Sequence, residues 1–249
     1  MRRFKTAAGW AALAAGCLLA SAVALAAPEG ETQQKAGNQQ KGISELNADT
    51  VDYNVKTGQM TAKGHVVIHY DGGIATGEYA AYNTKTFTGT MTGGVVADKE
   101  DMHLDCDRIE LVSKTKMTAI GNVHGWQKDK RVEAPIVEYD NEEGYARLPE
   151  GGILSSADGT FTADYMEGWT KTEHAKGVGN AHIISPPRDF EGGGDEAEYF
   201  GKETGKLVLT GNAWAVQENN TLKSGRLTVF LKDRSNTETV TNEEGKEEQ

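Results

Sequence analysis

A motif of one glycine, one further residue and one apolar or small residue recurs along the chain. Successive copies start 29, 28, 30, 28 and 32 residues apart. A near-constant period of this length is typical of folds built from stacked units. The fold therefore depends on what one such unit forms. The six glycines are Gly64, Gly93, Gly121, Gly151, Gly179 and Gly211.

A second motif opens each unit: a small residue, followed by alternating polar and apolar residues. Alternation of period two predicts strands with one buried face. Polar runs such as 56–58 and 141–144 separate the two halves of a unit and are typical of tight turns. Each unit is therefore two short strands joined by a turn. The openers start at Ala48, Gly77, Cys106, Ala134, Ala163, Gly194 and Ser224.

Seven such units predict an all-β fold with roughly 13 to 16 strands, given ordinary strand lengths. The apolar faces must cover each other, which predicts an open, extended β jelly roll over residues 44–232. A parallel β-helix is the competing arrangement. The short turns, rich in Gly and Asn, favour antiparallel hairpins.

The recurring glycines have two explanations. One is a bulge or bend in each strand, where a residue without Cβ lets the chain twist. The other is that they keep space open on the concave side of the sheet. The pattern favours the bulge.

The N-terminus predicts export. A basic start, an apolar run from Ala7 and the end Ala24-Leu25-Ala26 indicate a signal peptide over residues 1–27, cleaved after Ala26 or Ala27. A retained membrane anchor and lipidation at Cys17 are the alternatives. Residues 28–43 and 233–249 are polar and predicted to be disordered, the second being an acidic tail.

The charge of the mature chain excludes a nucleic-acid partner. Removing the three basic residues of the signal leaves 23 Lys and Arg against 37 Asp and Glu. Phosphates require a basic surface. Cys106 is the one cysteine outside the signal, so no intramolecular disulfide is expected, and it is predicted to be a small buried residue.

No motif indicates an enzyme, a metal site or a cofactor. His65 and His69 are four residues apart on a strand, too far to share a metal. Two acidic runs, 98–101 and 191–198, are interpreted as solvated turns between units. The tryptophans Trp126, Trp169 and Trp214 do not share a phase, so they do not predict an aromatic stripe.

What does recur is apolar surface. An unclosed stack of hairpins leaves edge strands at both ends and an interior that can open along one side, and such surface normally marks a binding site. Each buried CH₂ of an acyl chain contributes about 0.8 kcal/mol. A long apolar ligand therefore suits this chain better than a charged one.

The opener 48–53 and its continuation Met60 to Val66 resemble the OstA-like proteins, the LptA family of periplasmic lipopolysaccharide-transport proteins. The resemblance covers about residues 44–232 and implies an open jelly roll that shields lipid A acyl chains. It also implies head-to-tail homo-oligomers through edge strands, which bridge inner-membrane and outer-membrane transport components. The expected location is the periplasm, and the chain is expected not to be an enzyme.

By position, we expect eleven inward-facing residues to line the groove, although each could equally be ordinary core. Two other functions remain open: a membrane-anchored LptC-like component facing the periplasm, and a β-solenoid carbohydrate-active or surface protein. The expected groove residues are Val66, Ile68, Val95, Ile109, Leu111, Val123, Val137, Tyr139, Ile153, Ile183 and Leu209.

Overall fold

The computed structural model describes residues 43–70, 72–201, 203–218 and 220–231. The predicted signal peptide, the lipidation at Cys17, the polar leader up to residue 42 and the acidic tail lie outside the described residues. Within these ranges, no helix is both long enough and apolar enough to cross a membrane.

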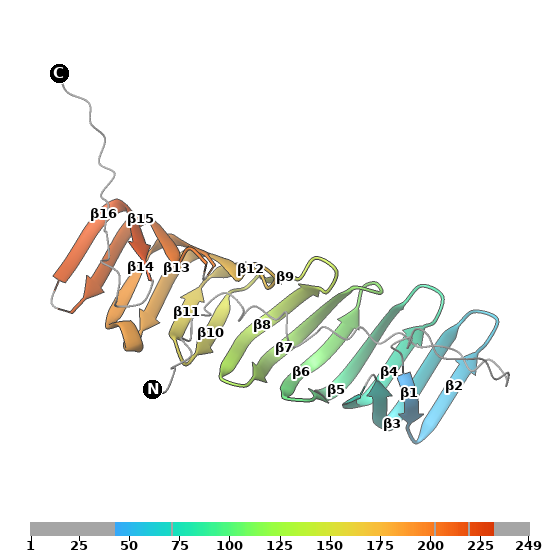
Figure 1. Ribbon diagram of the computed structural model, residues 1–249. Coiled ribbons are helices and arrows are strands. Elements are labelled where there is room, and N and C mark those ends of the chain that lie inside the picture. The colour runs from blue at the N-terminus through green and yellow to red at the C-terminus, as the bar shows by residue number, and fades with distance from the viewer. Residues whose placement is uncertain (1–42, 71, 202, 219, 232–249) are drawn as a thin grey trace, which may run out of the picture.

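The described chain forms one 16-stranded antiparallel sheet that winds along an elongated body (Figure 1). This confirms the predicted all-β fold and the hairpin arrangement over the parallel β-helix. A single turn of 3₁₀ helix, η2 (Pro186–Arg188), interrupts the series. The strands are β1 (Ile43–Asn47), β2 (Thr50–Asn54), β3 (Gln59–Tyr70), β4 (Gly73–Asn83), β5 (Thr88–Lys99), β6 (Met102–Leu111), β7 (Lys116–Gln127), β8 (Lys130–Asp140), β9 (Tyr145–Leu148), β10 (Gly152–Ser156), β11 (Gly159–Ala163), β12 (Tyr165–Trp169), β13 (His174–Ser185), β14 (Phe190–Phe200), β15 (Lys206–Gln217) and β16 (Asn220–Phe230).

Five of the six recurring glycines are bulges in the middle of long strands, as the pattern predicted, whereas Gly151 lies between β9 and β10. In β7 the pairing register shifts between Ile120 and Val123. Gly121 and Asn122 between them have φ angles of 78° and 46°. Two successive left-handed residues turn the strand sharply, which glycine and asparagine tolerate best. Equivalent register shifts occur in β3, β5, β13 and β15.

These bends fold the sheet into two facing layers. We call the half-strands that end at the upper turns of Figure 1, such as 84–87, the upper layer, and those that end at turns such as 100–101 the lower layer. The layers touch across the interior. A Cβ on Gly177, in the upper layer, would lie 2.5 Å from the ring of Phe161 in the lower layer.

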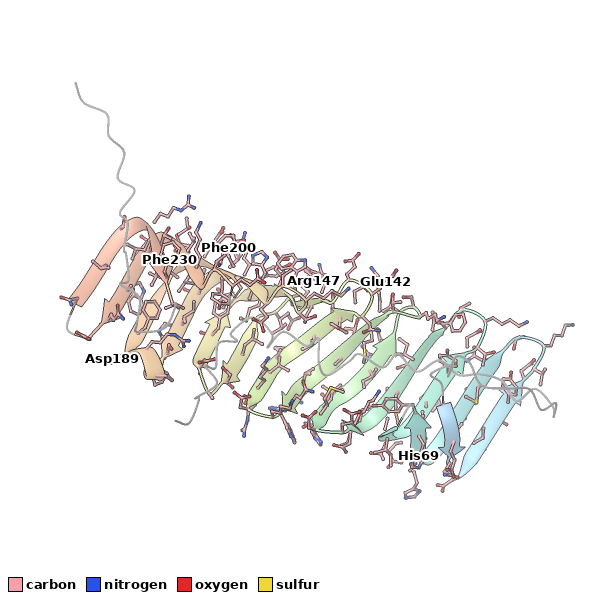
Figure 2. The ribbon with its side chains drawn as sticks, in the orientation of Figure 1. His69, Glu142, Arg147, Asp189, Phe200 and Phe230 are labelled. Carbon is pink, nitrogen blue, oxygen red and sulfur yellow. The ribbon has the colours of Figure 1, made fainter. Side chains whose placement is uncertain are left out.

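Figure 2 shows the two rims of this folded sheet, with Phe200, Phe230 and Arg147 along the upper one and His69 and Asp189 along the lower one. The inner faces of both layers form one apolar cluster that runs from β3 to Leu231. Asp140 and Ser185 are the polar or charged residues buried within the described ranges. The strands therefore bury one continuous apolar face, as their alternation requires.

An acidic side chain covers most of the bends. Asp107, on β6, lies over Gly121, and a Cβ there would meet its Oδ2 at 2.1 Å. The glycine is needed because the carboxylate occupies the space of a side chain. The same carboxylate contact joins Asp49 to Gly64, Asp164 to Gly179 and Asp195 to Gly211, while at Gly93 the Cβ and Cγ of Glu78 occupy this space.

The fourth unit departs from this pattern. Pro135 stands where five other openers have an acid, and the following long strand is split into β9 and β10. The neighbouring strand is split as well, into β11 and β12. Here β8 pairs with β9 in the upper layer and with β10 in the lower layer.

One predicted turn is wrong. Residues 191–198 lie inside β14, which pairs with β13 and β15 along its length. Gly192 and Gly193 serve close packing, because Trp214 and Phe190 lie where their side chains would be. The acidic run 98–101 does include a turn, between β5 and β6.

Candidate functional site

The inner faces of the two layers are the largest apolar surface of the described chain. Nine of the expected groove residues are buried there, with at most 9% of their surface exposed. Leu111 is partly buried and packs against the same cluster. The nine are Val66, Ile68, Val95, Ile109, Val123, Val137, Tyr139, Ile183 and Leu209.

Ile153 is the exception, and its predicted inward orientation is wrong. Its side chain is 42% exposed, while Leu154 beside it is 2% exposed and faces the interior. At this bend only Gly151 is left-handed, with a φ of 71°. One bend residue in place of two shifts the phase of the strand by one, which moves every side chain to the other face.

Small side chains make up much of the inner surface. Twelve of the 37 buried apolar residues are alanines, and Gly77, Gly89, Gly177 and Gly192 add positions without a side chain. Alanine and glycine extend little into the space between the layers. Many of the side chains that line the interior are therefore short.

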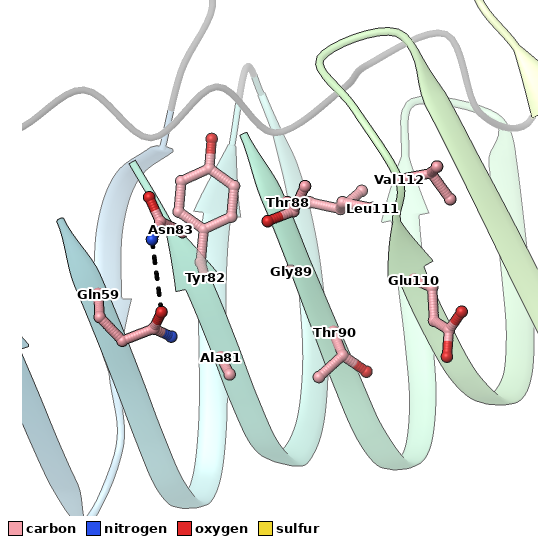
Figure 3. Close-up of a pocket in the computed structure, with 10 residues that line it drawn as sticks. All are labelled: Gln59, Ala81, Tyr82, Asn83, Thr88, Gly89, Thr90, Glu110, Leu111 and Val112. Atoms are coloured by element: carbon pink, nitrogen blue, oxygen red, sulfur yellow. Dashed lines mark hydrogen bonds between the residues drawn. The ribbon is translucent and has the colours of Figure 1, made fainter. Parts of the chain in front are cut away.

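The upper rim carries two depressions. The first has a volume of about 330 Å³ and lies where β3 to β6 approach their upper turns (Figure 3). Tyr82 and Leu111 from the inner face and Thr90 and Glu110 from the outer face contribute to it. The second, of about 390 Å³, lies over β7 to β9 and includes Tyr139. Both depressions include residues of the inner face, Leu111 in the first and Tyr139 in the second.

The C-terminal end of the interior is bridged by a polar cluster around Arg188. Its Nη1 donates to Asp158 Oδ1 and to Ser185 Oγ, each at 3.3 Å, and its Nε donates to the carbonyl oxygen of Leu231 at 3.3 Å. The amide of Leu231 donates to Gly205 in an upper turn at 2.7 Å. Arg188, at a lower turn, therefore ties the two layers together.

Both ends of the sheet keep a free edge within the described residues. β2 pairs with β3 alone, and β16 with β15 alone. All five residues of β2 are exposed, including the apolar Val51 and Tyr53. Exposed apolar edge strands are templates for pairing with another chain.

The outer face carries an aromatic row that the sequence did not reveal. Trp169 and His174 are cross-strand partners whose rings stack at 4.7 Å, and His174 stacks on Phe200 at 5.4 Å. Tyr145 continues the row beyond Trp169, with the centroids 5.2 Å apart. Trp169, His174 and Phe200 are stacked with interplanar angles of 15° and 17°, whereas Tyr145 is tilted by 52° to Trp169, so the four rings do not form one flat stacking platform.

The one cysteine among the described residues is buried, and no metal-binding cluster occurs among them. Cys106 is 5% exposed, as predicted, and burial raises the pKa of its thiol to about 11. A neutral thiol is a poor nucleophile and a poor metal ligand. Among residues 43–70, 72–201, 203–218 and 220–231, no group of three His, Cys, Asp or Glu side chains could hold a metal ion.

No protein-family model matches the chain, and no curated protein matches it by sequence. Among solved structures, the chain is similar to the crystal structure of LptH, the LptA homologous periplasmic component of the conserved lipopolysaccharide transport device from Pseudomonas aeruginosa. The two share 14% sequence identity and a TM-score of 0.33, over 57% of this chain and 94% of that chain.

Proposed function

We propose that the chain binds lipopolysaccharide in the periplasm and shields the lipid A acyl chains between its two layers. One observation carries this: the inner faces form a single apolar surface from β3 to Leu231. The path from β1 to β16 crosses 13 strands in sequence. At about 4.8 Å per strand step, the surface extends for roughly 55–60 Å.

The energetics favour acyl chains as ligands. Each buried CH₂ contributes about 0.8 kcal/mol, so a chain of about a dozen carbons gains on the order of 10 kcal/mol before ordering is counted. The alanine-rich lining offers this surface without Asp, Glu, Lys, Arg or His side chains. A ligand with its charged groups in water and its acyl chains between the layers would gain the energy of buried CH₂ groups and would place no charge against the apolar lining.

The free edges suit assembly into a longer conduit. β2 and β16 expose unpaired backbone groups at opposite ends of the same sheet, so one copy can pair with the next head to tail. We include in the proposal a homo-oligomer, joined at its ends to inner-membrane and outer-membrane transport components. The role is passive transport, without catalysis or a cofactor.

Site-specific photo-crosslinking tests the acyl-chain site. A photo-reactive amino acid at Ile109 or Leu111 faces the interior, and one at Arg108, next to Ile109, faces outward. We expect crosslinks to lipopolysaccharide from the two inward positions only. Equal crosslinking from inward and outward positions, in variants that keep the native circular dichroism spectrum, would contradict the proposal.

A carbohydrate-binding role is the second candidate, because a hollow of about 560 Å³ on the outer face, between β7, β8 and β10, combines apolar and hydrogen-bonding side chains. It would not exclude the first, since the two surfaces lie on opposite faces of the sheet.

A further inference from the structure

The break in the repeat leaves one bend without its carboxylate. We call each bend, together with the side chain that covers it, a corner. In five units an acid at the opener covers the bend of the next strand. At the fourth opener that place belongs to Pro135, and the chain passes from β9 to β10 through Gly151. The hydrogen-bonded Asp–Asn pair that fills other corners cannot form there.

A hollow of about 560 Å³ lies at this corner, between β7, β8 and β10. Its volume falls in the range of small-molecule sites, about 300–1,000 Å³. Asn122, His124, Glu133 and Ile153 are exposed and alternate with buried Val123, Ala134 and Leu154, so the hollow opens on the outer face. Its volume exceeds that of the two depressions on the upper rim, and it opens on the face opposite the acyl-chain surface, with Val123 and Ala134 of that surface among its lining residues.

The hollow combines apolar surface with both kinds of hydrogen-bonding group. Pro135 and Ile153 give it an apolar wall. His124 and Glu133 are direct cross-strand partners, and Ile153 is the next residue in the same row. Asn122 donates its amide to Asp107 Oδ2 at 3.1 Å, which leaves its side-chain carbonyl as an acceptor.

An aromatic ring extends this surface. Trp126 lies two residues beyond His124 on the same face of β7 and is 40% exposed. His103 stacks on it at 3.8 Å and is held by Asp98 at 2.6 Å, so the indole is fixed in orientation. Its partner on β8 is Arg131. A fixed, partly exposed indole beside polar groups offers an amphipathic contact at low entropic cost.

The charges around the hollow indicate which ligands fit. Glu133 lies in it, Asp105 is the cross-strand partner of His124 on the other side, and Arg131 is nearby on β8. This mixture does not concentrate positive charge, so a phosphate or other anion is disfavoured. A ligand that both donates and accepts hydrogen bonds and has an apolar face matches the groups present.

We propose that this hollow, with Trp126 at its border, binds an uncharged saccharide. The hydroxyl groups of the sugar would bond to Asn122, His124 and Glu133, and its C–H face would pack on Ile153 and Trp126. The site opens on the face opposite the acyl-chain surface and does not require the proposed transport function.

Titration of the mature chain by nuclear magnetic resonance tests this site, with N-acetylated chitotriose and maltotriose as probes. We expect at least one of them to shift the Trp126 indole N–H and Asn122 side-chain amide signals in a saturable way. Glu133→Gln and Ile153→Ala should each weaken binding tenfold or more. Ile184→Ala is the matched control, because Ile184 is 39% exposed on the same face but outside the hollow.

The proposal is overturned if neither saccharide shifts these signals at millimolar concentration. It is also overturned if the shifts persist with unchanged affinity in both Glu133→Gln and Ile153→Ala. Ile153→Ala should keep lipopolysaccharide crosslinking from Ile109, because Ile153 does not face the interior and Ile109 does not line the hollow. A failure of the saccharide site is thereby distinguished from a failure of the proposed transport function.

Discussion

The side-chain amide of Asn212 donates to both carboxylate oxygens of Asp195, at 3.1 and 3.2 Å, from the neighbouring strand. Asn212 is left-handed, with a φ of 51°, and follows the left-handed Gly211. Each Asp–Asn pair thus holds a bend that L residues seldom adopt. The same bond joins Asp107 to Asn122 and Asp164 to Asn180, which places a row of such pairs along the fold.

Gly211→Ala should destabilise the fold. The glycine has a φ of 70°, and a Cβ would lie 2.3 Å from Asp195 Oδ2. Strain and displacement of the carboxylate together predict a loss of about 1–3 kcal/mol in the free energy of unfolding, measurable by urea denaturation.

Gly225→Ala on β16 is the control, because a Cβ at Gly225 meets nothing within 4 Å and its φ is not positive. We expect a change within about 0.5 kcal/mol there. Equal losses at both positions would mean that the glycines act only through chain entropy and that the carboxylate contact has no part.

The first bend replaces asparagine by histidine and should respond to pH. His65 Nδ1 lies 3.0 Å from Asp49 Oδ2, and this hydrogen bond raises the pKa of His65 above its usual 6.5. A raised pKa in the folded state stabilises the bend below about pH 6.5, and this contribution is lost as pH rises through the raised pKa. Histidine titration by nuclear magnetic resonance should show the pKa of His65 falling in Asp49→Asn.

His65→Asn provides the matched comparison, because it restores the residue found at Asn122, Asn180 and Asn212. Amide exchange in β1 to β3 should vary less between pH 6 and 8 in this variant than in the native chain. An identical pH dependence in both would show that His65 does not control the bend.

The sequence predicted the class and the repeat because both follow from alternation and spacing. It did not predict the phase of β10. Gly151-Gly152-Ile153 matches the recurring glycine motif by composition, yet Gly152 is not left-handed, so Ile153 faces solvent. Whether one or two residues form a bend depends on the contacts of neighbouring strands, which a single sequence does not display.

Two other features were also hidden in the sequence. Gly192 to Gly194 looked like a turn, but these glycines make room for Phe190 and Trp214 and for the β15 backbone. The row of Tyr145, Trp169 and His174 joins residues from three strands. Their spacing along the chain is irregular because they approach the same turns from opposite directions. Only the cross-strand register brings them together.

Cys106 should resist alkylation in the folded chain. Burial raises the pKa of its thiol to about 11, so on the order of one thiol in a thousand is ionised at pH 8. We expect the rate of reaction with iodoacetamide to be at least a hundredfold lower in buffer than in 8 M urea, as measured by mass spectrometry.

Since the folded pKa of Cys106 lies above its unfolded value, rising pH should also weaken the fold. The destabilisation begins above about pH 8.5, where the unfolded thiol ionises, and continues until the folded thiol ionises. Cys106→Ala should lack this decline between pH 8 and 10. Rapid alkylation of the native chain would contradict the buried placement.

Arg188→Ala should loosen the C-terminal end of the stack. Arg188 and Asp158 expose only 16% and 14% of their side chains, and removing the guanidinium leaves the carboxylate partly buried without its ion-pair partner. The carbonyl of Leu231 loses a donor in the same step. We expect a loss of about 1–3 kcal/mol in the free energy of unfolding, with faster amide exchange in β16 than in β3 to β8.

Arg226→Ala, at an exposed arginine on β16, should have little effect on either measurement. Arg188→Lys should recover part of the stability, because lysine keeps the charge but cannot reach Asp158, Ser185 and Leu231 together. If Arg188→Ala left the exchange of β16 unchanged, Arg188 would not join the layers.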